Sequence, residues 1–248
     1  MQAIERFRYH AATLGVSGRI RKPFHHAICP QADLNLPESG GYVHSRVDNF
    51  NFLDLITFDR AIAFAAGSFS EKDDAFDATA AVTIEGLNIF NMITADRVTA
   101  RIASSHPRSG AEPRITPIGS SFENLRIAGY KVEVDLAVDT FAEFDTASEL
   151  RSACESADLS DRMQPHALNT DRAADEMSFT LVRSLRGLGK EIYVSGNEIR
   201  IRDFGVVRLA EIFISERKRR ISMVQFNLGS TPDSEGQAGG AEGNGSAN

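Results

Sequence analysis

An internal repeat limits the folds open to this chain more than any other feature of its sequence. Residues 46–68 align without a gap with residues 83–105, a shift of 37 positions, and 8 of the 23 aligned pairs are identical. A shorter third copy, FENLRIAG, begins at Phe122. Repeats of this length are typical of small structural units that bury their apolar faces only by lying side by side. We therefore expect two or three successive units of the same architecture.

Each copy places a residue that tolerates a left-handed backbone at the third position of its first strand: Asn49, Gly86 and Asn124. The apolar residues change from one alternating set to the other at this position, a pattern that predicts a β-bulge. Short connections are expected at residues 53–55 and 90–92, each followed by a returning strand. Units of strand, turn and strand in series predict an antiparallel sheet.

The remaining segments predict further strands and one helix. Two hairpins are expected, over residues 191–202 and 206–228, because alternating apolar residues flank short polar turns. A helix is expected at residues 147–157, since Thr146 and Glu149 fit a capping box. The predicted fold class is all-β, an antiparallel β-sandwich with internal strand-turn-strand repeats. It forms a single domain over residues 1–228 with a small helical and loop insertion at about 140–176.

The last 20 residues, 229–248, contain 6 glycines and no large apolar side chain. Ordering a glycine costs more backbone entropy than ordering any other residue, and this segment has little to bury in return. The sequence therefore predicts a disordered, Gly-rich tail whose removal leaves folding unchanged.

Charge and composition exclude several classes of protein. With 27 Lys and Arg against 34 Asp and Glu, the net charge is −7, which argues against general nucleic-acid binding. No window reaches the roughly 18 consecutive apolar residues of a transmembrane segment. Residues 1–22 lack the apolar core of a signal peptide, so a cytoplasmic location is expected. Cys29 and Cys154 are expected to be reduced thiols.

No motif in the sequence indicates a catalytic, cofactor-binding or metal site. A G-x-S-x-G elbow, a phosphate-binding loop and a dinucleotide fingerprint are all missing. His25, His26 and Cys29 form an H-H-x-x-C sequence, but the second half-site that zinc modules commonly carry is lacking. We therefore predict no catalytic residue, no cofactor and no metal, and the protein is not expected to be an enzyme.

Asp59-Arg60 and Asp96-Arg97 occupy equivalent positions of the repeat. One interpretation is a paired ligand site for carboxylates or phosphates, because arginine offers a planar fork of donors. The other is structural, with Asp accepting from turn amides and Arg pairing across strands. Duplication of both residues with the scaffold favours the structural interpretation.

Lys218, Arg219 and Arg220 belong to the one basic cluster of the chain, at the tip expected for the last hairpin. Such a tip is usually a solvated turn, but it could also contact an acidic partner or anionic lipid. We treat these three residues as a possible partner contact.

Residues 79–130 also resemble the choice-of-anchor P type of bacterial β-domain. The resemblance rests on Ile93-Thr94-Ala95-Asp96, Gly119-Ser120, Phe122, Leu125 and Gly129. It implies a β-sandwich in a secreted or surface-attached protein, so a surface location by a non-standard route is an alternative to the cytoplasm. The resemblance transfers no catalytic residue.

These observations favour a non-enzymatic β-sandwich that acts in assembly or protein–protein interaction, with a protein partner or by self-association. Two alternatives remain open: a sandwich that binds a small molecule or glycan, and a hydrolase whose site forms only in the fold. An unpaired edge strand would favour assembly, a lined groove would favour binding, and a pocket with buried His and Asp would favour the enzyme.

Overall fold

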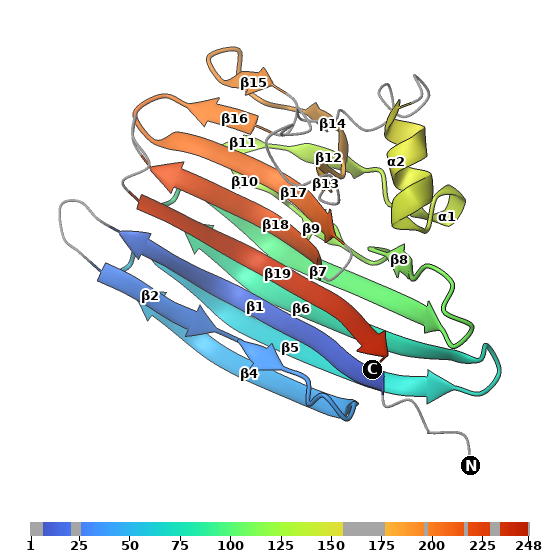
Figure 1. Ribbon diagram of the computed structural model, residues 1–248. Helices are drawn as coiled ribbons and strands as arrows, with labels where there is room; N and C mark the ends of the chain where they lie inside the picture. The colour runs from blue at the N-terminus through green and yellow to red at the C-terminus, as the bar shows by residue number, and fades with distance from the viewer. Residues whose placement is uncertain are drawn as a thin grey trace.

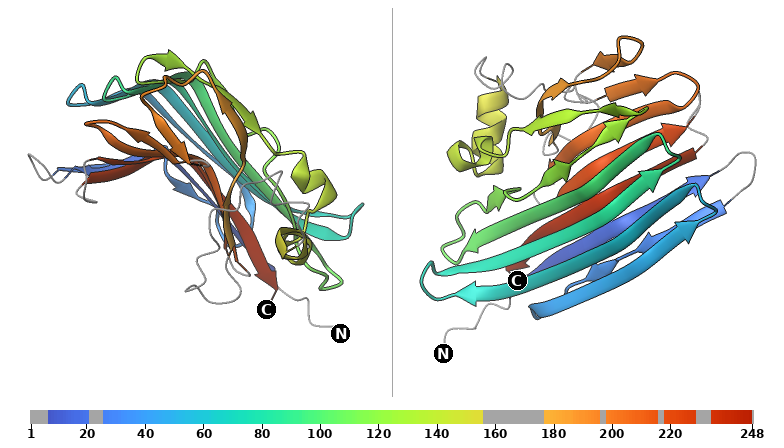
Figure 2. Two further views of the ribbon diagram at one scale, coloured as in Figure 1. Left: turned by 90° about the horizontal axis from the view of Figure 1, so that it is seen from above. Right: turned by 180° about the vertical axis from the view of Figure 1, so that it is seen from behind.

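The protein is a sandwich of two antiparallel sheets (Figure 1). The computed structural model describes residues 7–20, 26–155, 177–195, 198–215, 218–228 and 234–247. The two sheets face each other along most of their length, as the views from above and behind show (Figure 2). The predicted all-β antiparallel sandwich is confirmed.

The eight-stranded sheet contains the repeat, in the strand order β11-β10-β7-β6-β5-β4 with β8 and β9 also paired to β7. Its strands are β4 (Gly41–Phe52), β5 (Ile56–Ser70), β6 (Ala75–Ile89), β7 (Ile93–Pro107), β8 (Arg114–Thr116), β9 (Ser121–Glu123), β10 (Arg126–Ile127) and β11 (Tyr130–Lys131). The short connections expected at residues 53–55 and 90–92 are turns. The first two residues of each turn, Leu53-Asp54 and Phe90-Asn91, have positive φ, a conformation that suits the twist of a hairpin.

The nine-stranded sheet joins the two ends of the described chain, in the order β15-β16-β17-β18-β19-β1-β2 with β3 paired to β1 and β13 to β17. Its strands are β1 (Phe7–Ile20), β2 (His26–Gln31), β3 (Leu34–Asn35), β13 (Met177–Thr180), β15 (Tyr193–Ser195), β16 (Glu198–Ile201), β17 (Gly205–Ser215), β18 (Lys218–Leu228) and β19 (Ser234–Ala247). A separate pair consists of β12 (Glu133–Leu136) and β14 (Val182–Arg186). Both predicted C-terminal hairpins are present.

The disordered tail predicted over residues 229–248 is wrong for residues 234–247. These form β19, which pairs with β18 along one side and with β1 along the other. The prediction rested on the lack of large apolar side chains and did not include backbone pairing. Backbone hydrogen bonds on both sides, together with close packing of small residues such as Ala238 and Ala241, stabilise the strand instead.

Small residues fill the middle of the core and aromatic rings close its two ends. β19 lies against β6 and β7, and β1 lies against β5 and β6. The inner positions along these strands are largely alanines: Ala11, Ala61, Ala63, Ala78, Ala80, Ala100, Ala238 and Ala241. At one end the rings of Phe7 and Phe76 stack with centroids 4.3 Å apart. At the other end Phe50 and Phe58 stack at 4.9 Å.

Two short helices, α1 (Thr140–Glu143) and α2 (Ala147–Glu155), lie at one side of the sandwich (Figure 1). The predicted capping box is present: the Glu149 backbone N–H donates to Thr146 Oγ1 and the Thr146 N–H donates to Glu149 Oε2, both at 3.3 Å. Leu150 of α2 is buried. At four and nine residues, neither helix could cross a bilayer. The rest of the predicted insertion, residues 156–176, lies outside the described residues.

Truncation after Leu228 is expected to abolish cooperative unfolding. Without β19, β18 and β1 lose their common partner and the alanines of β6 and β7 lose their cover. Circular dichroism during a thermal melt checks this, because the intact chain should show one sharp transition that the truncated chain lacks. A truncated chain that melts like the intact one would restore the tail interpretation.

Candidate functional site

Equivalent positions of the three repeat copies share one backbone geometry. Asn49, Gly86 and Asn124 have φ values of 55°, 66° and 50°. The predicted β-bulge is wrong, however, because a bulge sets two residues against one. Glu85 pairs with Arg97 and Leu87 with Ala95, so the register is the same on both sides of Gly86. β6 and β7 each have one irregular residue here, Gly86 and Asp96, so the strands kink without an inserted residue.

The aspartates of the repeat face these left-handed residues. Asn124 Nδ2 donates to Asp96 Oδ2 at 2.6 Å, so Asp96 binds a side-chain amide and not the turn amides that we expected. A Cβ added at position 86 would overlap the Asp59 carboxylate. Glycine at this position therefore satisfies both the positive φ and the close approach of Asp59.

Arg60 and Arg97 belong to a row of ion pairs that crosses the repeat sheet. Arg60 lies 3.1 Å from Asp48 and 3.3 Å from Glu85. Arg97 lies 3.5 Å from Glu85 and 2.8 Å from Glu123. Hydrogen bonds from Arg46 and Arg60 hold the pKa of Asp48 below its usual value. Because both arginines already bind carboxylates of this sheet, the geometry favours the structural interpretation over a ligand site.

The nine-stranded sheet carries a similar row of left-handed residues. Ala210 of β17 and Gly239 of β19 have φ values of 48° and 69°, and Ala32, directly after β2, has 48°. The intervening strands place Met223 and Gly15 in the same row. In both sheets, a row of residues that crosses the strands thus alternates between left-handed and ordinary backbone conformations, and the strands kink at this row.

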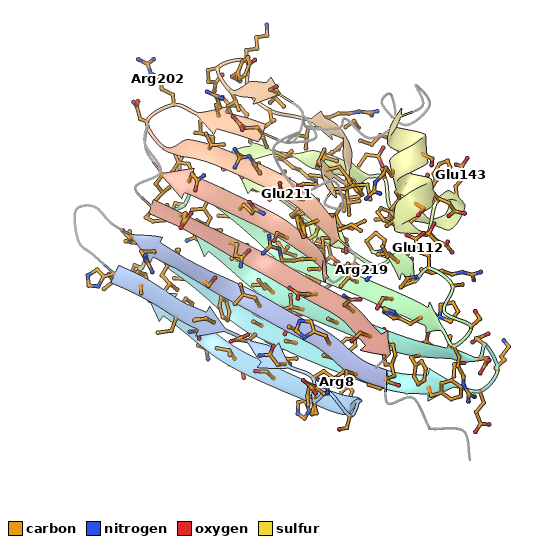
Figure 3. The ribbon with its side chains drawn as sticks, in the orientation of Figure 1. Arg8, Glu112, Glu143, Arg202, Glu211 and Arg219 are labelled. Atoms are coloured by element: carbon orange, nitrogen blue, oxygen red, sulfur yellow. The ribbon has the colours of Figure 1, made fainter. Side chains whose placement is uncertain are left out.

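The expected basic tip is divided between two faces of β18. Arg219 is 2% exposed and donates to Asn244 Oδ1, so its interpretation as an exposed partner contact is wrong (Figure 3). Burial lowers the pKa of Arg219, and the charge of Glu112 opposes that shift. Arg220 lies 5.9 Å from the ring centroid of Phe213 on the outer face. These residues begin a strand, whose alternation turns neighbouring side chains apart; the Lys218 side chain lies outside the described residues.

His10 Nε2 lies 2.8 Å from Glu242 Oε1, and the described histidines form no larger cluster with acids or thiols. His106 is 7% exposed, and burial together with the nearby charge of Arg219 lowers its pKa to about 4. Cys29 is an exposed free thiol. Among the described residues no group of three or more His, Cys, Asp or Glu could hold a metal ion. His25, His166 and the Cys154 side chain lie outside the described residues.

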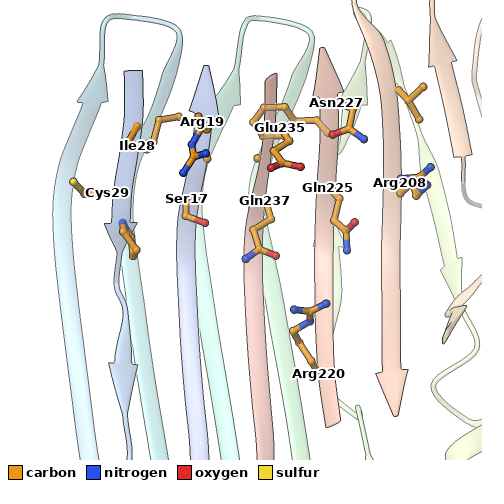
Figure 4. A pocket seen from close by; sticks show the side chains of 16 residues that line it. Ser17, Arg19, Ile28, Cys29, Arg208, Arg220, Gln225, Asn227, Glu235 and Gln237 are labelled. Atoms are coloured by element: carbon orange, nitrogen blue, oxygen red, sulfur yellow. The ribbon is translucent and has the colours of Figure 1, made fainter. Parts of the chain in front are cut away.

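A groove with a volume of about 690 Å³ lies on the outer face of the nine-stranded sheet (Figure 4). It crosses β2, β1, β19, β18 and β17. Its polar lining consists of Ser17, Arg19, Arg208, Arg220, Gln225, Asn227, Glu235 and Gln237. A second hollow of about 260 Å³ shares Arg208, Arg220 and Gln225 with it, so the two are adjacent. No described residue that lines either hollow is a histidine.

β4 forms one edge of the repeat sheet and pairs only with β5 among the described strands. None of its twelve residues is fully buried. Tyr42 is 64% exposed, and its ring lies near those of His44 and Phe64, with centroids 5.9 and 6.2 Å away. Ile62, on the neighbouring strand, is 42% exposed. A strand whose outer edge has no partner among the described strands therefore borders this sheet, with an apolar surface beside it.

The model of one protein family, described as Domain of unknown function (DUF8256), matches residues 7–177. The chain belongs to the DUF8256 family. The DUF8256 match begins at the first residue of β1, spans the whole repeat sheet and ends at the first residue of β13. It leaves out the last strands of the nine-stranded sheet, including β19. No curated protein and no solved structure matches the chain.

Sequence reasoning missed the groove of this DUF8256 chain because it did not treat residues 234–247 as a strand. A signal was present: polar residues alternate at Ser17/Arg19, Gln225/Asn227 and Glu235/Gln237. These three pairs lie side by side on β1, β18 and β19, which places all six side chains on one face. Recognising the last pair as part of a strand would have identified this polar face.

Gly86→Val is expected to lower the free energy of unfolding by about 1–3 kcal/mol. A β-branched residue is strained at positive φ, and its Cβ would overlap the Asp59 carboxylate. Chemical denaturation measures the change. Asn49→Gly is the matched control, since glycine accepts the positive φ of that position. Equal stability of Gly86→Val and the parent would contradict the assignment.

His106 is expected to make stability depend on pH between about 4 and 6.5. The pKa of about 4 in the folded protein lies below the ordinary histidine value of 6.5, so the unfolded chain takes up the proton first. Stability from the neutral ring is therefore complete above pH 6.5 and falls as the pH drops towards 4, by at most about 3 kcal/mol. His106→Gln should flatten this part of the curve in denaturant titrations, whereas His44→Gln, at an exposed site, should not. A slope unchanged by His106→Gln would refute the assignment.

Proposed function

We propose that the protein is a non-enzymatic assembly module that pairs its β4 edge with β4 of a second copy. The observation that carries this proposal is the outer edge of the twelve-residue β4, which pairs with no strand in the described part of the chain. A long strand edge presents unpaired N–H and C=O groups, and pairing with another strand satisfies them. The exposed cluster of Tyr42, His44, Phe64 and Ile62 beside the edge adds apolar surface that association would cover.

Charge favours one register for this pairing. β4 carries Arg46 and Asp48, with Val47 between them. In an antiparallel pair with the two-fold axis at Val47, Arg46 of each copy lies opposite Asp48 of the other. An axis at Arg46 or at Asp48 would set like charges directly opposite each other, which destabilises a strand pair. The register centred on Val47 therefore fits best.

This register also extends an existing interaction. Asp48 stands at the end of the ion-pair row that runs through Arg60, Glu85 and Arg97. Within one copy, Arg46 Nε lies 2.7 Å from Asp48 Oδ2. Across the two-fold axis, Arg46 of one copy would pair with Asp48 of the other, and these pairs would connect the ion-pair rows of the two copies. A closed two-fold pair leaves neither β4 edge open.

A cysteine at position 47 tests the register. In a Cys29→Ser background, Val47→Cys is expected to form an intermolecular disulfide under mild oxidation, because the two residues face each other at the axis. Ser45→Cys is the matched control, since its copies would lie about 13 Å apart, too far for a disulfide. Non-reducing electrophoresis measures the cross-linked fraction, which should be high for Val47→Cys and low for Ser45→Cys.

Sedimentation velocity on the unmodified chain separates assembly from register. A concentration-dependent dimer is expected, and Arg46→Asp should weaken it at least tenfold. A chain that stays monomeric at every concentration would overturn the assembly proposal. A dimer in which Val47→Cys cross-links no better than Ser45→Cys would overturn the register. The cytoplasmic location and the resemblance to choice-of-anchor P type domains stay predictions.

A further inference from the structure

We propose that the groove on the outer face of the nine-stranded sheet binds a short carboxylated oligosaccharide. This site lies away from the repeat sheet and does not depend on pairing of β4. The first observation is the set of polar groups that the fold leaves unused. Among the described residues, Ser17, Arg19, Gln225 and Asn227 make no side-chain hydrogen bond or ion pair, although all four line the groove (Figure 4).

The chemistry of these groups matches a hydroxyl-rich ligand. A sugar hydroxyl both donates and accepts a hydrogen bond, and a side-chain amide does the same. Gln225 and Asn227 supply such amides from β18, and Gln237 supplies a third from β19. Glu235 adds an acceptor in the same row as Arg19 and Asn227. The groove therefore offers mixed donors and acceptors, which suits several hydroxyls better than a single anion.

Two guanidinium groups remain available for a carboxylate. Arg208 is already bound, with Nη2 lying 3.0 Å from Glu198 Oε2. Arg19 and Arg220 make no ion pair with any described residue, although Arg220 lies over the Phe213 ring. Guanidinium groups bind carboxylates through paired hydrogen bonds. Since the whole chain carries a net charge of −7, a carboxylated sugar suits this local positive charge better than a nucleic acid does.

The shape of the groove sets the length of the ligand. Five adjacent strands spaced about 4.8 Å apart give a length of roughly 19 Å across the face. The volume of about 690 Å³ lies in the range typical of ligand sites. Arg19 shares a row with Asn227, whereas Arg220 lies seven residues away along β18. An oligosaccharide of a few residues that reaches both arginines therefore runs obliquely to the strands.

Isothermal titration calorimetry with trigalacturonate tests the proposal, with maltotriose as the neutral trisaccharide and galacturonate as the monomer. The trimer is expected to bind at least tenfold more tightly than either control compound. Arg19→Gln and Gln225→Ala should each weaken binding of the trimer at least fivefold. Arg202→Gln removes an exposed arginine that does not line the groove and should change nothing.

Three outcomes would overturn the proposal. They are no heat from trigalacturonate at millimolar concentration, equal affinity for maltotriose, and groove variants that bind like the parent chain. A thermal melt of each variant controls for folding, and the exposed position of Arg19 predicts no shift. If Gln225→Ala alone proves unstable, Asn227→Ala supplies the same test from the same strand.

Discussion

The sandwich depends on the insertion of β19 between β18 and β1. This strand has almost no side-chain volume to bury, and its stabilisation comes from two backbone ladders. The small side chains also let the two sheets approach closely, because glycine and alanine on β1 and β19 pack against alanine on β5 and β6. Phe7/Phe76 and Phe50/Phe58 stack at the two ends, and a further buried pair, Phe141/Phe179, stacks between α1 and β13.

A second constraint is the row of left-handed residues that crosses each sheet. Such residues occur in alternate rows of strands: Asn49 on β4, Gly86 on β6 and Asn124 between β9 and β10 in one sheet, and Gly239 and Ala210 among those in the other. One residue of the facing strand is also irregular, so the register is the same on both sides of the kink. In both strands the buried residues change from one alternating set to the other at this point. The kink thus turns side chains from one face to the other without shifting the pairing.

The sequence allowed the repeat, the hairpins and the capped helix to be predicted, because each has a local signal. Paired turns, alternating apolar residues and the Thr146/Glu149 box all act over a few residues. The position of Gly86 was also predictable, although its kink was taken for a bulge. The long-range strand pairing could not be predicted. β19 is ordered because it pairs with β18 on one side and β1 on the other, and no local sequence pattern reveals these partners. The same is true of Arg219, whose burial depends on strand alternation beginning earlier than the charged run suggested.

Pairing of β1 with β19 also determines when this protein can finish folding during its synthesis. His10 and Glu242, whose side chains lie 2.8 Å apart, are separated by 232 positions. The hairpins of the repeat need only neighbouring residues and can form as soon as they leave the ribosome. β1 is synthesised before every other described strand, and its partner β19 is complete only once the chain has been made up to Ala247. Contacts between residues so distant in sequence slow folding. An apolar strand that stays unpaired during this time is a typical binding site for a molecular chaperone.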